Sequence, residues 1–375
     1  MGDKQPCTRT DDNCPADGQY LYNTEVVFNR EGCLVAKYHK ENLFEAERLF
    51  WNQPENTEHI YFDADFGRFG LITCFDAVFK KPAIELVEQY NVTNMIFSTA
   101  WMNVYPHYAS VAYHSGWARN MRVNYLSANI HNVQNRLVGS GVYGPDGIID
   151  YTFNMSSTSG HLIVAKVPII RNRNSATSPT GSVSSLTSKK SFKLKVFGDD
   201  FQFQPLQGVE GTVSVCDNNV CCTLKFSRSN SSEFYAIGAF DGMHTVEGTY
   251  YFEICMLARC TENYTDCGST LADETTTVFS SFILTGSMPT KYVFPEVVTA
   301  DLNFTTDWEY GTADNVKQIK GKKKAIFSVV LMGRNFDKDP DSAFVDSNEK
   351  ASNSFQLIPD LIAMAVCLLT YVVCN

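Results

Sequence analysis

The sequence is poor in positive charge and lacks a long apolar segment. Its 31 lysine and arginine residues are outnumbered by 41 acidic residues, which gives the 375-residue chain a formal net charge of −10. Nucleic-acid binding needs a basic face, so this balance argues against a nucleic-acid partner. The strongly apolar stretch from Leu361 to Val373 is shorter than the roughly 20 residues that span a bilayer. We therefore expect neither a nucleic-acid-binding protein nor a spanning helix.

The beginning of the chain lacks the apolar core of a signal peptide, since Met1 to Pro6 is polar. The body nonetheless carries twelve cysteines and five Asn-x-Ser/Thr sequons, at Asn91, Asn154, Asn230, Asn263 and Asn303. Together these features are typical of an oxidising compartment. We therefore expect a secreted or cell-surface glycoprotein whose sequence lacks the N-terminal part of a longer protein.

The cysteines outside the C-terminal tail form two groups and two single residues. Cys7 and Cys14 bracket a loop rich in Asp, Thr and Pro, and we predict a local disulfide between them. Cys33 and Cys74 are left without partners. An even set suited to three bridges lies in the C-terminal half: Cys216, Cys221, Cys222, Cys255, Cys260 and Cys267.

One unpaired thiol lies where catalysis is feasible. Leu71 to Thr73 has the pattern of the end of a buried strand, and Cys74 lies between this strand and a helix predicted over Pro82 to Tyr90. A thiol at such a turn lies near backbone N–H groups, which favour the thiolate and can hold an oxyanion. Cysteine is also often buried for packing alone. This segment by itself leaves a nucleophile and a core residue equally open.

The next segments alternate as in a layered α/β core, with a strand over Thr93 to Thr99 and a helix over Tyr108 to Met121. His107 and His114 are seven residues apart, too far for a shared metal without other ligands. Gly139 to Gly144 matches a dinucleotide-binding pattern by letter, but Pro145-Asp-Gly147 makes a turn where a helix should begin. We therefore predict no metal and no cofactor.

The second half of the chain is β-rich. A linker or surface loop is predicted over residues 171–190, where Ser, Thr, Asn and Gly dominate. Six strands are predicted beyond it, over 211–215, 222–226, 233–238, 250–257, 279–284 and 325–331. The basic cluster from Lys317 to Lys324 is interpreted as a solvated loop.

Residues 336–375 form a distinct tail. Small polar residues from Asp346 to Asn348, a polar spacer and an apolar end have the layout of a GPI-attachment signal. The alternative is a tail that packs on the protein or anchors it poorly.

Five segments resemble the vanin and biotinidase branch of the nitrilase superfamily of carbon–nitrogen hydrolases: Tyr38–Phe44, Phe69–Phe75, Thr99–Val104, Gly139–Gly141 and Ala236–Tyr250. The resemblance extends over almost the whole chain. It implies an α+β fold: an incomplete α-β-β-α nitrilase sandwich over residues 1–170, then a β-rich, disulfide-bonded domain over 191–335. It also implies that Gly139 to Gly147 forms a hairpin around Pro145.

The same resemblance implies that Cys74 is the nucleophile and Lys40 the lysine of a Glu-Lys-Cys triad. A second active-site glutamate would be Glu47 or Glu45, although a solvated acidic loop is at least as good an interpretation. Residues assigned to the substrate pocket are Trp101, His114 and His131.

The triad glutamate of this family lies well upstream of the lysine. Nothing before Lys40 matches its context, and Glu25 and Glu31 lie in the wrong segments. We therefore expect the triad to be incomplete in this chain.

The function implied is that of a pantetheine hydrolase, which releases pantothenate and cysteamine from a small-molecule amide. We expect it on the extracellular face of the membrane through a lipid anchor, or secreted. A biotinidase-like amidase and a cell-surface glycoprotein without turnover are the alternatives. The oligomeric state is left open.

Overall fold

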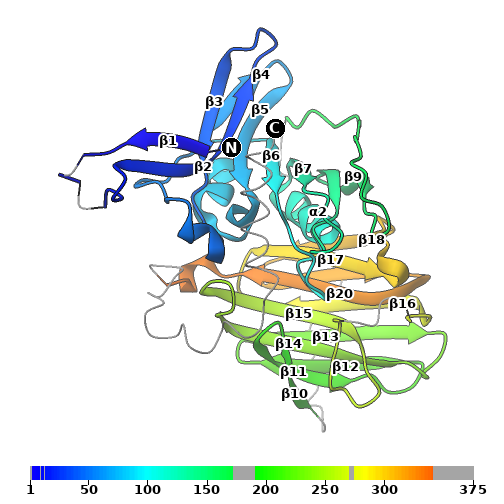
Figure 1. The fold of residues 1–375 in the computed structure, drawn as a ribbon. Coiled ribbons are helices and arrows are strands. Elements are labelled where there is room, and N and C mark those ends of the chain that lie inside the picture. The colour runs from blue at the N-terminus through cyan, green and yellow to red at the C-terminus, as the bar shows by residue number, and fades with distance from the viewer. Residues whose placement is uncertain (1, 9, 12, 172–190, 270–273, 341–375) are drawn as a thin grey trace.

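The computed structural model describes residues 2–8, 10–11, 13–171, 191–269 and 274–340. Figure 1 shows an upper part, blue to cyan, that combines strands with a helix, and a lower part, green to orange, built from strands. This arrangement confirms the predicted α+β fold with a β-rich second domain. Residues 172–190 of the linker predicted over 171–190, and residues 341–375 of the tail predicted over 336–375, lie outside the described residues.

A six-stranded sheet organises the first part, with its strands in sequence order: β4 (Tyr61–Ala64), β5 (Gly67–Thr73), β6 (Asn94–Thr99), β7 (Asn124–Asn129), β8 (Ser140–Gly144) and β9 (Gly147–Thr152). The strands β5, β6 and β7 are parallel to one another, and β4, β8 and β9 pair antiparallel with their neighbours. Leu71 and Ile72 are adjacent and both fully buried, because side chains cover both faces of β5. The predicted hairpin around Pro145 is confirmed by β8 and β9.

A separate antiparallel sheet is formed by β1 (Gly2–Pro6), β2 (Gln19–Phe28) and β3 (Leu34–His39). Tyr38 on β3 packs against Leu71 of β5, and both are fully buried. Lys40 follows β3 directly, so this contact brings the end of β3 to the end of β5.

The helix predicted over Pro82 to Tyr90 is irregular and ends two residues earlier, at Glu88. It consists of a π-helical turn, η3 (Lys80–Ile84), followed by one α-helical turn, α1 (Glu85–Glu88). The second predicted helix is confirmed as α2 (Ser110–Met121).

Helix α2 lies between the six-stranded sheet and the second part of the molecule (Figure 1). Gly116 faces the backbone of the second part so closely that an added Cβ would lie 2.5 Å from the carbonyl oxygen of Pro295. A side chain at position 116 would therefore force the two parts of the molecule apart.

The second part is an eleven-stranded antiparallel system. Its strands are β10 (Phe192–Val196), β11 (Asp199–Pro205), β12 (Glu210–Asp217), β13 (Val220–Arg228), β14 (Phe234–His244), β15 (Tyr250–Cys260), β16 (Val278–Ser287), β17 (Tyr292–Thr299), β18 (Trp308–Ala313), β19 (Val316–Gly321) and β20 (Lys324–Arg334). The six predicted strands are all present as parts of β12, β13, β14, β15, β16 and β20.

One prediction for this part is wrong. The basic cluster from Lys317 to Lys324 is not a solvated loop, since it forms most of β19 and the start of β20. Lys317 is itself buried, and its ammonium donates to the carbonyl oxygen of Asp314. Pairing of β19 with β16 and β18 buries the consecutive residues Lys317, Gln318 and Ile319, so the strand has no alternating pattern that the sequence could reveal.

The predicted disulfides are confirmed. Cys7 pairs with Cys14, and the six cysteines of the second part form the bridges Cys216–Cys221, Cys222–Cys255 and Cys260–Cys267. Within the described residues, Cys33 and Cys74 form no disulfide.

The two parts share one hydrophobic core, in which Trp117 of α2 stacks on Phe294 of β17. Arg334 of β20 is fully buried at this junction and donates to the carbonyl oxygen of Val78, 2.9 Å away. Its guanidinium also pairs with Asp339 at 2.6 Å. The second part thus holds the turn that follows β5. In the described part of the chain, no helix is both long and apolar enough to cross a membrane.

Candidate active site

Cys74 lies on a strained turn at the carboxyl end of β5. The strand ends at Thr73, and Cys74 opens the 3-10 helix η2 (Cys74–Val78) with a φ of +50°. Positive φ is uncommon for residues other than glycine and is concentrated at functional sites. The first N–H groups of a helix have no partner within it, so the turn presents donors beside the thiol. The predicted strand-to-helix turn is present.

Asp76 holds this turn to the segment that carries Lys40. Its buried carboxylate accepts hydrogen bonds from the phenol of Tyr38 at 2.7 Å and from the N–H of Thr73 at 2.9 Å. It also accepts from the backbone and side-chain N–H groups of Asn42, at 2.8 and 3.0 Å. Burial raises the pKa of Asp76, and Lys40 and these donors oppose that rise. The Asp76 carboxylate therefore joins the segment that carries Lys40 to the turn that carries Cys74.

Lys40 is buried beside Cys74 and is paired with Glu47. Its side chain is 1% exposed, and its ammonium donates to a carboxylate oxygen of Glu47. Burial alone would lower the pKa of Lys40, but the negative groups of Glu47, Cys74 and Asp76 raise it. Lys40 is therefore a fixed positive charge at neutral pH.

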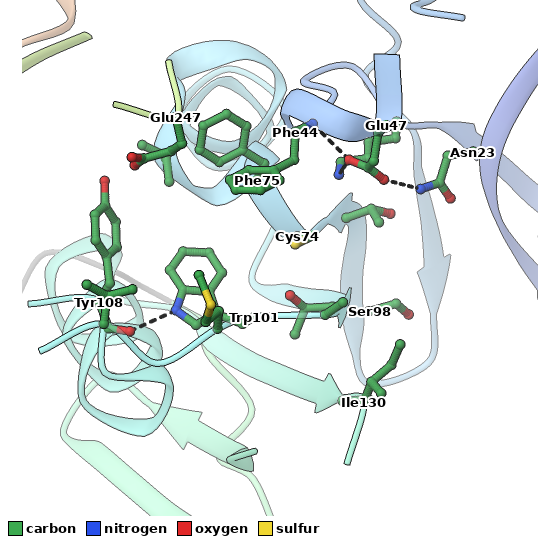
Figure 2. A pocket seen from close by; sticks show the side chains of 18 of the residues that line it. Asn23, Phe44, Glu47, Cys74, Phe75, Ser98, Trp101, Tyr108, Ile130 and Glu247 are labelled. Carbon is green, nitrogen blue, oxygen red and sulfur yellow. Dashed lines mark hydrogen bonds and ion pairs between the residues drawn. The ribbon is translucent and has the colours of Figure 1, made fainter. Parts of the chain in front are cut away.

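Glu47 is held on both of its oxygens. One accepts from the side chain of Asn23 at 2.8 Å, and the other accepts from Lys40 and from the N–H of Phe44 at 2.8 Å. Figure 2 shows Glu47 between Phe44 and Asn23, beside Cys74. Of the two predicted second glutamates, Glu47 is the one in the cavity, whereas Glu45 lies on the exposed side of the same turn.

Cys74, Lys40 and Glu47 line one cavity of about 380 Å³, which is the size of a small-molecule site. Its wall is mainly apolar and includes Phe44, Phe75, Val78, Trp101, Met102, Val104, Ile130 and Phe197. The thiol of Cys74 is partly accessible and is bonded to no other cysteine in the part of the chain that the structure describes. A thiol, a buried ammonium and backbone donors at one cavity suit nucleophilic attack on a carbonyl.

Trp101 is the predicted pocket residue that the structure places in this cavity. Its indole N–H donates to the carbonyl oxygen of Tyr108 at 3.0 Å, and its backbone N–H donates to Asn129 at 2.9 Å (Figure 2 shows the first of these bonds). These bonds fix the indole as a wall beside Cys74.

The structure does not bring His114 or His131 to the cavity. His114 lies in the core behind Trp101, where it contacts Phe97 and hydrogen-bonds to Ser127 at 3.1 Å. Burial lowers the pKa of His114 to about 3, so it is a neutral packing residue. His131 hydrogen-bonds to the carbonyl oxygen of Ser157 and does not line the cavity. His114 lies within α2, and His131 follows β7 by two residues. Neither position in the sequence indicates whether the side chain faces the cavity or the core.

Sequence reasoning missed the contribution of the second part of the molecule. Glu247, from the loop between β14 and β15, and Phe197, from the turn between β10 and β11, line the same cavity as Cys74. Glu247 belongs to the segment Ala236–Tyr250, which carried part of the family resemblance. The resemblance singled out this segment but did not indicate that it lies next to Cys74.

Glu25 lies close to the cavity without lining it. Its carboxylate accepts from the hydroxyl of Ser98 at 2.8 Å and from that of Thr73 at 3.3 Å, and both partners are cavity residues. Burial raises the pKa of Glu25 to about 7, against the opposing effect of these two hydroxyls. Glu25 therefore lies beside the cavity, although its sequence context does not match that of the family's triad glutamate.

In the residues that the structure covers, no group of three or more His, Cys, Asp or Glu side chains is placed to hold a metal ion.

Two family models match the chain, one over the first part of the fold and the other over the β-rich second part. A model of the carbon-nitrogen hydrolase family matches residues 8–151, and a model of the Vanin C-terminal domain matches residues 190–339.

Three relatives show the extent of the similarity. The pantetheinase of Homo sapiens is 40% identical over 379 aligned residues, which cover 99% of this chain and 73% of that protein. The pantetheinase of Mus musculus is 42% identical over 346 residues, covering 90% of this chain and 67% of that protein. The biotinidase of Bos taurus is 33% identical over 377 residues, which cover 90% of this chain and 71% of that protein.

Proposed function

Because the chain belongs to the vanin and biotinidase branch of the carbon–nitrogen hydrolases, we propose that it is a pantetheine hydrolase-like amidase. The observation that carries this proposal is the shared cavity of Cys74, Lys40 and Glu47. The higher identity to pantetheinases than to biotinidase favours a pantetheine-like amide over a biotinyl amide.

In the proposed reaction, the Cys74 thiolate attacks the amide carbonyl carbon and forms a C–S bond. The ammonium of Lys40 and the N–H of Phe75 stabilise the oxyanion of the tetrahedral intermediate. Collapse of this intermediate breaks the C–N bond, and the amine leaves with one added proton. Water then hydrolyses the thioester to a carboxylic acid and regenerates the thiolate.

We assign Glu47 to holding Lys40 rather than to proton transfer. Both of its oxygens are engaged by Lys40, Asn23 and the Phe44 N–H, so a further proton would break an existing ion pair. Proton transfer to the amine belongs to the family's upstream triad glutamate, whose context the sequence before Lys40 does not match. We therefore propose that residues 1–375 alone turn over about 10²- to 10⁴-fold more slowly than a complete triad.

We also propose that the protein acts in an oxidising compartment, at the cell surface or after secretion, with attachment through a lipid anchor. Four disulfides among the described residues support the compartment. Release from cells by phosphatidylinositol-specific phospholipase C tests the anchor. A protein that stays on the membrane after both lipase treatment and carbonate extraction would contradict the lipid anchor.

The decisive experiment measures cysteamine release from pantetheine by residues 1–375 and by the Cys74→Ala and Cys33→Ser variants. We expect slow release that Cys74→Ala abolishes and Cys33→Ser leaves unchanged, because Cys33 is an exposed free thiol away from the cavity. Faster hydrolysis of biotinyl-lysine than of pantetheine would favour the biotinidase-like alternative. No turnover of either substrate would favour a non-catalytic surface glycoprotein.

A further inference from the structure

The second part of the molecule contributes a charged residue to the cavity. Glu247 lies in the short loop between β14 and β15 and is only 7% exposed, yet it lines the cavity of Cys74. In the view of Figure 2, Glu247 and Glu47 lie on either side of Phe75, with Glu247 beside Tyr108. Glu47 is paired with Lys40, whereas Glu247 has other hydrogen-bond partners.

A buried histidine fixes Glu247. His244 is fully buried, with one ring nitrogen 2.7 Å from Glu247 and the other 2.8 Å from Asp199. Carboxylates only accept hydrogen bonds, so both ring nitrogens must donate and the ring is an imidazolium. Burial alone would lower the pKa of His244, but its bonds to Asp199 and Glu247 raise it to about 9. Glu247 is therefore held in one orientation by a charged partner.

Two tyrosines extend this arrangement along the cavity wall. The phenol of Tyr250 donates to the second oxygen of Glu247. Because the Tyr250 proton is used in that bond, Tyr108 donates its own proton to Tyr250, across 3.0 Å. Tyr108 lines the cavity and bonds through its carbonyl oxygen to Trp101. The chain of donors thus points toward Glu247 and leaves the carboxylate as its terminal acceptor.

Glu247 has acceptor capacity left for a ligand. A carboxylate offers about four lone-pair positions. Among the described residues, side chains fill two of them, one on each oxygen, through His244 and Tyr250. The surrounding cavity wall is apolar, with Phe75 and Phe197 among its members. An ionised acceptor in such a wall attracts a donor group more strongly than it would in water.

We propose that Glu247 is a specificity-determining residue, which accepts a hydrogen bond from an O–H or N–H group on the acyl chain of the amide substrate. This inference rests on the proposed function and names the chemistry that the site selects. In pantetheine, the acyl side of the scissile amide carries two hydroxyls and a second amide N–H. The amine side carries only a thiol, which is a weak donor. The carboxylate therefore selects acyl chains with a remote neutral donor and rejects those that end in a carboxylate.

The test compares pantetheine with N-acetylcysteamine, which has the same scissile bond but an acyl group without remote donors. We measure kcat and KM for both substrates with the wild type, Glu247→Gln and Glu247→Ala. The control is Glu210→Ala, an exposed carboxylate at the start of β12. The ratio of the two kcat/KM values should fall about 10- to 100-fold in Glu247→Ala, through a higher KM for pantetheine. It should fall less in Glu247→Gln, which keeps a neutral acceptor, and not at all in Glu210→Ala.

A binding measurement separates this inference from the proposed function. Calorimetric titration of pantetheine into Cys74→Ala, and into the same variant with Glu247→Ala, needs no turnover. Binding that weakens about 10-fold or more with Glu247→Ala supports the subsite even if the wild type hydrolyses nothing, in which case the proposed function alone fails. Equal loss for both substrates, an unchanged ratio, or no pantetheine binding to Cys74→Ala would overturn the inference. Glu247→Gln keeps the test valid if the alanine variant does not fold.

Discussion

The phenol of Tyr38 donates a 2.7 Å hydrogen bond to the buried carboxylate of Asp76. Tyr38 lies two residues before Lys40, and Asp76 lies two residues after Cys74. One hydrogen bond therefore joins the segment of the cation to the turn of the thiol. Asp76 also accepts from Thr73 and Asn42, so the relative position of Lys40 and Cys74 depends on this carboxylate.

Removing either partner of this bond should loosen the site. Tyr38→Phe should lower the free energy of unfolding by about 1–2 kcal/mol, since a buried acceptor loses one of its donors. Asp76→Asn should cost more, about 2–4 kcal/mol, because an amide cannot accept all four bonds. Urea denaturation measures both effects. Tyr61→Phe, on exposed Tyr61, is the control and should change stability by less than about 0.5 kcal/mol. Equal effects of Tyr38→Phe and Tyr61→Phe would contradict this role of the Tyr38 phenol.

The sequence was sufficient to predict the parts of the site that depend on local patterns. The unbroken apolar run before Cys74 predicted a buried strand and a turn, and β5 and η2 have that arrangement. Residues at a distance were not predictable in the same way. Glu247 reaches the cavity only because β14 and β15 pack against the first part, a contact that no periodicity encodes.

His114 and His131 were predicted to line the substrate pocket, but neither lines the cavity, for a related reason. Their positions along the chain do not specify which face of the sheet covers them. His114 lies behind Trp101, and only the packed structure distinguishes a residue lining a cavity from one supporting its wall. The same limit applies to Glu25, which is distant from Cys74 in sequence but bonds to its neighbour Thr73.

Lys40 should control the reactivity of Cys74. Replacement by methionine removes a buried cation beside the thiol, so the thiolate loses its main electrostatic support. In a Cys33→Ser background, Lys40→Met should slow alkylation of Cys74 by iodoacetamide at pH 7 about 10-fold or more. The control is Lys37→Met, because the Lys37 side chain is 37% exposed and pairs with Asp3. Unchanged alkylation in Lys40→Met would show that the ammonium does not act on the thiol.

Glu25 should make stability depend on pH. Burial raises the pKa of Glu25 from its ordinary value of 4.5 to about 7, so the fold favours the protonated carboxyl. This contribution is complete below pH 4.5 and is lost as the pH rises through 7. Glu25→Gln, which stays neutral, should therefore match the wild type at pH 4.5 and exceed its unfolding free energy at pH 8 by about 1–3 kcal/mol.

Chemical denaturation at both pH values measures that difference. Glu31→Gln is the control, because Glu31 is an exposed residue in the turn after the same strand. As a substitution of an exposed residue, it should change the unfolding free energy by less than about 0.5 kcal/mol. A Glu25→Gln effect that does not change with pH would contradict the raised pKa.

The disulfides should differ in their contribution to stability. Cys222–Cys255 closes a separation of 33 residues between β13 and β15, whereas Cys216–Cys221 closes a separation of five within one hairpin. A longer loop removes more entropy from the unfolded chain, so the double alanine variants should lose roughly 3–4 and about 2 kcal/mol respectively. Denaturation of the two variants gives the comparison. A larger loss for the hairpin bridge would show that strain or packing, not loop length, sets the order.

Gly116 should couple the two parts of the molecule to the site. In Gly116→Ala the new Cβ would lie 2.5 Å from the carbonyl oxygen of Pro295, and backbone on both sides must shift to admit it. We expect a loss of about 1–3 kcal/mol in unfolding free energy. We also expect a higher KM for pantetheine, because Glu247 is carried by the part that moves and Cys74 by the part that stays. Gly160→Ala, where nothing lies within 4 Å of the added Cβ, is the matched control. A variant that is destabilised but keeps its KM would mean that the clash is absorbed within α2 and β17 and never reaches the cavity.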